Sequence, residues 1–317
     1  MTTDSIPLFN EGQRELDIRV GLGMFAAEAQ LEHLLGIARQ VDVAAGETLF
    51  ARDAAVATLF QVMSGELEMR APDRGTWRIA GAGTVGFVDF MLGRRHARTA
   101  ITTTPVRLLE LVASDYRDYL EENFEVSHRL IAHLSGEIMA AVVTGPDAAE
   151  LLATPGRPRP RTSADVELPM VERLMMLSRM TAFAGASTQG LANLAQCARE
   201  VRYERGALIA FAGSRSNVVS VLVDGEVELE LPSGVHVTRR GPNLVAHLEE
   251  LATTPRLTTV TALSPATVLQ IDRELLLDRF EEHFDLPLAL FAFLARDQQR
   301  LNERAATAGE PLPTGWR

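Results

Sequence analysis

The chain has 317 residues, of which 46% are hydrophobic and 23% are charged, and its formal net charge is −11 at pH 7. This length is too great for one ordinary core and suits two domains of roughly 100–150 residues each. The negative charge argues against a general nucleic-acid-binding protein, because most of the surface would repel a polyanion. Cys197 is the only cysteine, which excludes a disulfide framework and a cysteine-based zinc site and suits a reducing cytoplasm. Its helical sequence context predicts a buried packing role.

Targeting and membrane signals are not found in the sequence. The first ten residues lack the basic start and the apolar run of a signal peptide. The longest apolar stretch, residues 286–295, is about half as long as a membrane-spanning helix. We therefore expect a cytoplasmic protein that does not contact a membrane.

An internal repeat dominates the sequence. Residues 31–135 recur at residues 191–295 with a constant offset of 160 and no net insertion or deletion. The glycines that set turns are largely kept, as Gly65 and Gly225 illustrate. A repeat of this length indicates that one folded unit has been duplicated.

The first copy is predicted to open with an amphipathic helix. Residues 25–39 place apolar side chains at helical spacing, and the helix is expected to end near Val41. Residues 43–111 then contain many short segments separated by turns with Gly, Asp and Pro, which predicts a compact barrel or sandwich of strands. Helical spacing resumes at residues 115–143.

A linker and a second copy follow. Residues 157–161 alternate arginine and proline, which favours an extended spacer. Thr162 and Ser163 beside this run fit two interpretations: a phosphorylation or docking site for an arginine-preferring kinase, or a solvated linker whose charges keep it extended. In the second copy a helix is expected over residues 191–200, strands over residues 201–271, and a helix from residue 274 to about residue 303.

Both copies share motifs that carry a family resemblance. The first copy has residues 45–50 (AGETLF) and 59–68 (LFQVMSGELE), and the second has residues 205–209 (RGALI) and 221–228 (VLVDGEVE). They resemble the opening strands of cyclic-nucleotide-binding domains, the sensor modules of catabolite-activator-type regulators and of protein kinase A regulatory subunits. The resemblance implies a mainly β fold with flanking helices: two β-barrel (jelly-roll) domains, each with an N-terminal helix and closing C-terminal helices. The expected divisions are an N-terminal arm (1–20), domain 1 (21–143), a Pro/Arg-rich linker (144–172), domain 2 (173–305) and a C-terminal tail (306–317).

Ligand binding in the resembled family depends on a phosphate-binding cassette. It reads Phe-Gly-Glu, a short apolar turn, and then Pro-Arg with the arginine ten positions after the glycine. The glycine lets backbone N–H groups approach, the turn presents its N-terminus to the phosphate, the arginine pairs with the phosphate, and the glutamate accepts from the ribose hydroxyl.

The first copy departs from this cassette at two positions. Gly86 is kept, but Phe87 replaces the carboxylate and His96 replaces the phosphate-binding arginine. A phenyl ring cannot accept a hydroxyl hydrogen bond, and a mostly neutral imidazole is a poor substitute for a guanidinium. Two interpretations stay open for the three arginines nearby: together they hold an anion, or they form an exposed basic turn paired with carboxylates elsewhere. These arginines are Arg94, Arg95 and Arg98.

The second copy departs from the cassette in a complementary way. It keeps Arg256 at the family spacing, but Ala246 replaces the glycine and His247 replaces the carboxylate. We expect the methyl group of Ala246 to block a backbone position that needs positive φ or close ligand approach. Glu249 and Glu250 add negative charge to the turn. We therefore predict that Arg256 pairs with an acidic neighbour.

Other chemistries find little support. His128 and His133 are five residues apart and do not share one helical face for a metal. A nucleophile elbow, a P-loop and a dinucleotide fingerprint are absent from the sequence. Only 18 residues follow Gln299, so no helix-turn-helix output domain is expected there. A metal-dependent barrel enzyme is kept as a third possibility, and we expect no catalysis.

The sequence thus favours a non-enzymatic regulatory or scaffolding protein that acts through a protein partner of unknown identity, without a cofactor and without nucleic acid. The alternative is a genuine sensor of a cyclic nucleotide or another phosphate-bearing small ligand. Residues 286–294 are apolar nearly all round, which favours either packing between the two copies or a homo-oligomer through the closing helices. Candidate ligand-binding residues are Gly86, Arg94, Arg95, His96, Arg98, His247 and Arg256.

Overall fold

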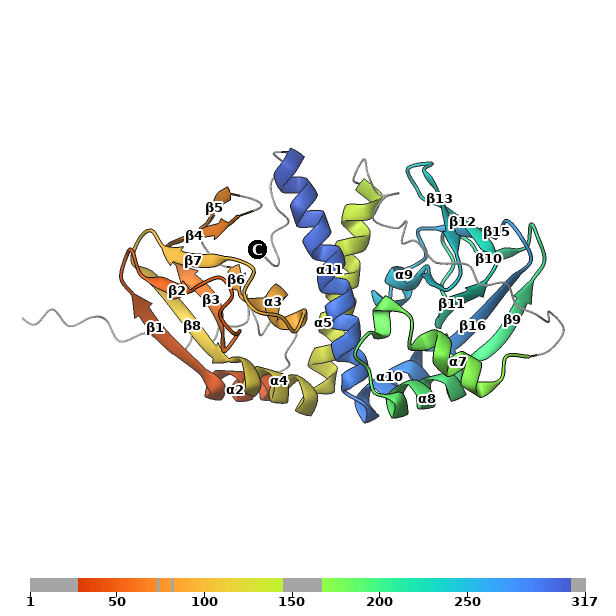
Figure 1. The fold of residues 1–317 in the computed structure, drawn as a ribbon, viewed down its shortest axis with the longest axis horizontal. Coiled ribbons are helices and arrows are strands. Elements are labelled where there is room, and N and C mark those ends of the chain that lie inside the picture. The colour runs from red at the N-terminus through yellow and green to blue at the C-terminus, as the bar shows by residue number, and fades with distance from the viewer. Residues whose placement is uncertain (1–27, 73–74, 81–82, 145–166, 309–317) are drawn as a thin grey trace, which may run out of the picture. The chain divides into compact units, whose positions relative to one another are not determined.

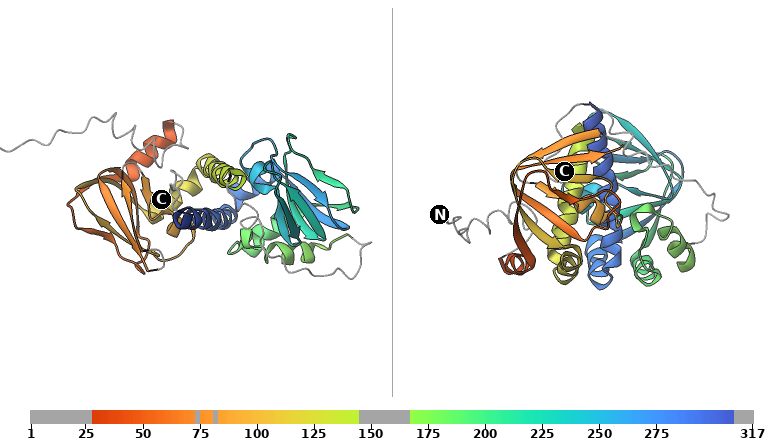
Figure 2. Two further views of the ribbon diagram at one scale, coloured as in Figure 1. Left: turned by 90° about the horizontal axis from the view of Figure 1, so that it is seen from above. Right: turned by 60° about the vertical axis from the view of Figure 1, so that its left-hand side comes forward.

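The computed structural model describes residues 28–72, 75–80, 83–144 and 167–308 (Figure 1). The chain separates into two compact units, with the division after Ser127. Within the described residues, each unit contains two four-stranded antiparallel sheets with helices at their ends, and Figure 2 shows these sheets from two further directions. The expected class, two antiparallel β domains with flanking helices, is confirmed.

The first unit pairs its strands in the orders β1-β8-β3-β6 and β2-β7-β4-β5. Buried and less buried side chains alternate along β4, where Leu67 and Met69 enter the core and Glu66 and Glu68 do not. This period of two is the pattern of a strand with one buried face. The strands are β1 (Ala38–Val43), β2 (Thr48–Phe50), β3 (Thr58–Ser64), β4 (Glu66–Ala71), β5 (Gly75–Ala80), β6 (Gly83–Val85), β7 (Thr99–Thr102) and β8 (Val106–Val112).

The second unit repeats this topology as β9-β16-β11-β14 and β10-β15-β12-β13. Its strands are β9 (Arg199–Tyr203), β10 (Leu208–Ala210), β11 (Val218–Asp224), β12 (Glu226–Glu230), β13 (His236–Arg240), β14 (Asn243–Val245), β15 (Thr259–Ala262) and β16 (Ala266–Asp272).

The repeat extends to strand register and to irregularities within the strands. Gln61 pairs with Leu109, and Val221 pairs with Leu269, each 160 residues later. The register shifts between Val62 and Ser64 in β3 and again at the equivalent place in β11. The offset read from the sequence therefore describes a duplication of three-dimensional structure, as expected.

Gly65 and Gly225 are required by the turns that begin β4 and β12. They adopt φ values of 96° and 95°, a region that L side chains rarely occupy. A Cβ atom at either position would lie 2.5 Å from a backbone carbonyl oxygen, that of Pro105 or that of Pro265. Both the conformation and the space exclude any other residue.

The first described element of the first unit is helix α2, which ends at Ile37 rather than near Val41. Ala38, the last position of the predicted apolar face, begins β1 and pairs with Leu111 of β8. Strand pairing with β8 thus ends the helix earlier than the spacing of its apolar residues predicts. The helices of this part of the chain are α2 (Glu28–Ile37), α3 (Phe87–Met91), α4 (Ala113–Glu122) and α5 (Phe124–Thr144).

In the second unit, the helix expected over residues 191–200 is α8, which begins at Thr188 and ends at Cys197, so Arg199 and Glu200 lie in β9. Cys197 itself is half-buried rather than buried. The expected closing helix is interrupted at His283. The helices are α7 (Met170–Leu177), the 3-10 turn η1 (Thr181–Phe183), α8 (Thr188–Cys197), α9 (His247–Leu251), α10 (Arg273–Glu282) and α11 (Asp285–Ala308).

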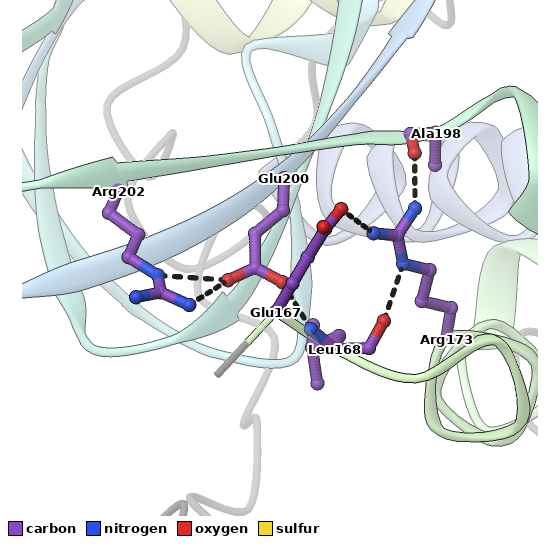
Figure 3. A network of polar contacts seen from close by, with 6 residues as sticks. All are labelled: Glu167, Leu168, Arg173, Ala198, Glu200 and Arg202. Atoms are coloured by element: carbon purple, nitrogen blue, oxygen red, sulfur yellow. Dashed lines mark hydrogen bonds and ion pairs between the residues drawn. The ribbon is translucent and has the colours of Figure 1, made fainter. Parts of the chain in front are cut away.

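Arg173 fastens the start of the second unit (Figure 3). Its guanidinium donates to the carbonyl oxygens of Leu168 and Ala198 at 2.9 and 2.5 Å and pairs with Glu167 at 2.5 Å. Glu200 of β9 accepts from the backbone N–H of Leu168 at 2.6 Å. These bonds hold residues 167 and 168 against α7 and β9. The domain boundaries expected at residues 143 and 173 stay predictions, and Thr162 and Ser163 lie outside the described residues.

Among the described residues, no helix combines the length and the apolar character that crossing a membrane needs.

Candidate ligand-binding cassettes

The first cassette, residues 85–99, begins with a sharp turn between β6 and α3. Gly86 has φ 92° and is followed directly by Phe87, the first residue of α3. The N–H of Phe90 donates to the Gly86 carbonyl oxygen at 3.0 Å and closes the first turn of the helix. The positive φ of Gly86 thus sets the sharp turn from β6 into α3.

Phe87 belongs to the core and does not line an open site. Its side chain is 1% exposed, and its ring meets Tyr116 of α4 edge-on with centroids 5.2 Å apart. Such edge-to-face pairs add to the stabilisation from burial. The position of the family's ribose-binding carboxylate is therefore used to fasten α3 to α4.

Asp89 is the central residue of the first cassette, and the sequence analysis did not single it out. Its carboxylate is 1% exposed and accepts from Arg94 Nε at 2.8 Å and from the backbone N–H of Ala97 at 3.2 Å. The Nδ1 atom of His96 lies 3.6 Å from the same carboxylate. An anion belonging to the chain itself thus lies within the turn that receives a phosphate in the resembled family.

The environment of Asp89 favours its charged form. Burial alone would raise its pKa, but the nearby His96 imidazole, the charge of Arg98 and the hydrogen bonds from Arg94 and Ala97 together hold the pKa below its ordinary value. Hydrogen bonds and nearby positive charges stabilise a carboxylate in this way. Asp89 is therefore an anion at neutral pH.

His96, at the position of the family's phosphate-binding arginine, is built into the barrel. Its side chain is 2% exposed, and its ring stacks on Phe50 at a centroid distance of 3.7 Å and an angle of 11°. Its backbone exchanges hydrogen bonds with Asp53 and Ala54 at 2.9 and 3.0 Å. The imidazole therefore packs against Phe50, contacts Asp89 and is closed to solvent.

The three arginines of the turn contact different groups. Arg94 binds Asp89, Arg95 donates to the Asp53 carbonyl oxygen at 2.7 Å, and Arg98 lies over the ring of Trp77 at 5.6 Å. Of the predicted ligand residues, the structure brings Gly86 close to His96, since a Cβ at Gly86 would lie 3.4 Å from His96 Cε1. Arg94 and Arg98 both act on the Asp89 carboxylate, whereas Arg95 binds the Asp53 carbonyl oxygen.

The second cassette, residues 245–259, keeps the turn although alanine replaces the glycine. Ala246 adopts φ 49° and ψ 32°, and α9 begins directly after it. The expectation that its methyl group would block this conformation is wrong. A left-handed conformation costs an L residue only about 1–2 kcal/mol, which the surrounding fold can supply.

His247 replaces the second carboxylate and is also buried. It is 5% exposed, and its ring lies 5.6 Å from that of Phe293 in α11. Burial, and next the charge of Arg239, lower its pKa to about 3. A neutral imidazole in this place cannot replace the ribose-binding carboxylate.

Arg256 forms an ion pair with Glu250 at 2.7 Å, with both side chains almost fully buried. The expected pairing of Arg256 with an acidic neighbour is confirmed. Burial raises the pKa of Glu250 to about 7, although Arg256 opposes this shift. The neighbouring Glu249 accepts from the Thr258 hydroxyl at 2.7 Å. The guanidinium that the family directs at phosphate is therefore engaged by the chain's own carboxylate.

Neither cassette keeps the full set of residues that the resembled family uses for a cyclic nucleotide. The position that binds the ribose in the resembled family holds Phe87 in one copy and His247 in the other, and neither side chain has a carboxyl group. The position expected to bind the phosphate faces Asp89 in the first copy and Glu250 in the second. In a buried setting, a second anion beside either carboxylate is strongly disfavoured.

Within residues 28–72, 75–80, 83–144 and 167–308, no group of three or more His, Cys, Asp or Glu side chains is placed to hold a metal ion.

Comparisons with known proteins give one family match. The model of the cyclic nucleotide-binding domain family matches residues 200–283, which span β9 to β16 and α10. No curated protein matches the chain. This match lies within the second unit, and the first unit repeats the strand order and register of the second.

Several solved structures are similar to the chain. One is the regulatory domain of Toxoplasma gondii PKA crystallised with cAMP, with 16% identity, coverage of 92% of this chain and 100% of that chain, and a TM-score of 0.35. Another is the regulatory subunit of a cAMP-independent protein kinase A from Trypanosoma brucei, with 15% identity, coverage of 96% and 95%, and a TM-score of 0.36. The sensor domain of the transcriptional regulator DNR from Pseudomonas aeruginosa has 23% identity, coverage of 43% and 92%, and a TM-score of 0.37.

Proposed function

We propose that this chain, a tandem of two cyclic-nucleotide-binding-like domains, is a cytoplasmic, non-enzymatic regulatory or scaffolding protein that acts through a protein partner. Neither cassette takes a cyclic nucleotide. One observation carries the proposal: in each cassette a buried carboxylate of the chain contacts the residue at the position of the family's phosphate-binding arginine.

In the first cassette, entry of a phosphate would require Asp89 to leave its partners. The carboxylate would lose the bonds from Arg94 and Ala97 while staying buried. Leaving a charged group buried without its hydrogen bonds costs several kcal/mol. A ligand would bind only if its new contacts stabilised the complex by more than this free-energy cost.

In the second cassette, the same argument applies to Glu250. A phosphate could reach Arg256 only by displacing this carboxylate from a pair that is almost fully buried. Breaking a buried ion pair by removing one partner costs about 3–5 kcal/mol. The fold thus favours the internal pair over a ligand.

Restoring the family residues in the first cassette tests this reasoning. The triple variant Phe87→Glu, Asp89→Ala and His96→Arg removes the internal anion and supplies both missing groups. We expect isothermal titration calorimetry with cyclic AMP to give binding by the triple variant and none by the wild-type chain. Asp118→Ala, which removes an exposed carboxylate of α4, is the matched control. Binding by the wild-type chain equal to that of the variant would overturn the proposal.

A homo-oligomer through the closing helices α5 and α11 is part of the same proposal. The apolar side chains of α11, among them Leu286, Leu290, Phe291 and Leu294, are buried in the single chain, and α11 packs against η1, α8 and α10. Association would therefore have to use other residues of these helices. Size-exclusion chromatography with light scattering tests this point: a mass equal to one chain of 34.6 kDa at all concentrations would exclude it.

A further inference from the structure

The first cassette is bordered by a cluster of arginines that has no counterpart in the second. The second cassette has small or uncharged residues at the equivalent positions, although the two units share strand order and register. The fold therefore does not require arginine there. We call the cluster the arginine rim; its members are Arg52, Arg94, Arg95 and Arg98. The equivalent residues, 160 positions later, are Ala212, Thr254, Pro255 and Thr258.

Two segments far apart in the sequence form the arginine rim. Arg52 follows β2, and the other three arginines lie in the turn before β7. The N–H of Asp53 donates to the His96 carbonyl oxygen at 2.9 Å, and the N–H of His96 donates to the Ala54 carbonyl oxygen at 3.0 Å. The 2.7 Å bond from Arg95 to the Asp53 carbonyl oxygen ties the segments further. These backbone bonds hold the rim in one place.

The arginine rim is accessible to a partner. The side chain of Arg52 is 48% exposed, that of Arg94 is 36% exposed, and Arg95 is exposed. Asp53, whose side chain is 77% exposed, lies 3.5 Å from the Arg52 guanidinium, and the buried Asp89 pairs with Arg94, which leaves Arg52 and Arg95 as the more exposed guanidinium groups of the rim. The rim thus presents guanidinium groups at the surface of a chain whose net charge is −11.

We propose that the arginine rim binds an acidic, extended segment of a protein partner. This inference rests on the proposed function, because a chain whose cassettes hold no nucleotide must act through other contacts. A guanidinium presents five N–H donors in a planar fork that matches a carboxylate. The bond from Arg95 to the Asp53 carbonyl oxygen uses one of these donors. Carboxylates spaced along a peptide suit arginines spaced along two adjacent segments.

Nucleic acid fits the arginine rim less well. A polyanion longer than the rim would also meet the negative surface of the chain. Single strands are bound by aromatic faces on which bases stack. Trp77 is an aromatic side chain at the rim, and the Arg98 guanidinium already lies over its ring at 5.6 Å. A short acidic peptide needs no aromatic face for stacking, and it can contact the arginine rim without reaching the negative surface around it.

Fluorescence anisotropy on the full chain tests the proposal. The probe is a labelled peptide of about 12 residues in which Glu alternates with Gly, and the reference is the same peptide with Gln in place of Glu. The test variant is Arg52→Ala with Arg95→Ala. The matched control is Arg205→Ala with Arg215→Ala, which removes two exposed arginines of the second unit and changes the net charge equally.

We expect the Glu peptide to bind the wild-type chain and the control equally, and the test variant about tenfold more weakly. Binding should weaken between about 50 and 300 mM NaCl, because salt screens exposed charges. Arg52→Glu with Arg95→Glu should abolish it, while the circular dichroism spectrum stays that of the wild-type chain.

Three results would overturn the proposal: no binding of the Glu peptide, equal binding of the Gln peptide, or tighter binding of single-stranded DNA of similar length. Each can occur while the wild-type chain still fails to bind cyclic AMP. Failure of this inference is therefore distinguishable from failure of the proposed function.

Discussion

Arg256 Nη2 and Glu250 Oε1 lie 2.7 Å apart in the second unit, and their side chains are only 7% and 2% exposed. The arginine that the family resemblance assigned to a ligand therefore stabilises the fold. Glu250 extends from α9, whereas Arg256 lies in the turn that leads to β15. The pair joins the two ends of the cassette.

Arg256→Ala is expected to destabilise the chain strongly. The substitution leaves Glu250 buried without its partner, which costs about 3–5 kcal/mol when the carboxylate stays charged. Urea unfolding at pH 8 measures the loss. Arg240→Ala, which removes an exposed partner of Glu226, should change the free energy of unfolding by at most about 1 kcal/mol. Equal effects of the two variants would contradict the role assigned to the buried pair.

The buried Glu250 also predicts a dependence of stability on pH. Its pKa in the folded chain is about 7, above the ordinary value of 4.5. A carboxyl group with a raised pKa stabilises the fold fully below its unfolded pKa, and this contribution is lost as the pH rises through the folded pKa. Glu250→Gln should therefore flatten the fall in the free energy of unfolding between pH 4.5 and 7. An unchanged slope in urea titrations across this window would refute the assignment.

The two cassette turns predict opposite effects of exchanging glycine and alanine. Ala246→Gly removes a strained positive φ and should stabilise the chain by up to about 1 kcal/mol, after allowance for the greater freedom of glycine in the unfolded state. Gly86→Ala should destabilise it, because φ is 92° and the new methyl group would lie 3.4 Å from His96.

Ala252→Gly provides the control for this pair, since Ala252 has an ordinary φ of −73° and the substitution there should only destabilise. Thermal unfolding followed by circular dichroism compares the three variants. Destabilisation by Ala246→Gly as large as that by Ala252→Gly would show that Ala246 is not strained.

Arg173 is expected to hold the start of the second unit. Arg173→Ala leaves the carbonyl oxygens of Leu168 and Ala198 without this donor, which should cost about 2–3 kcal/mol. Arg173→Lys should recover only part of this, because an ammonium lacks the planar fork that reaches several acceptors. Arg179→Ala, at an exposed position after α7, is the control. Full rescue by lysine in urea unfolding would contradict the assigned geometry.

The fold could be predicted from the sequence because both copies of the repeat keep glycines at turns that only glycine can form. Gly65 and Gly225 fix equivalent turns, and the offset of 160 holds through strand pairing such as Gln61 with Leu109. The helix end at Ile37 could not be predicted, because Ala38 continues the apolar spacing of the helix while pairing with Leu111 in the folded chain. Tertiary pairing overrode the local pattern there.

The candidate site was less predictable. The absent carboxylates at Phe87 and His247 could be read from the sequence, but the part played by Asp89 could not. Asp89 accepts from residues five and eight positions later in the chain, and only the folded turn brings them together. Its one signal in the sequence was an acidic residue amid apolar residues, at the position that holds Glu249 in the second copy.

Isothermal titration of the wild-type chain with cyclic AMP tests the central claim most directly. The internal pairs of Asp89 with Arg94 and of Glu250 with Arg256 predict no binding heat at any concentration at which the restored variant binds. Sub-micromolar binding by the wild-type chain that disappears in His96→Ala or in Arg256→Ala would contradict the account and identify the chain as a sensor.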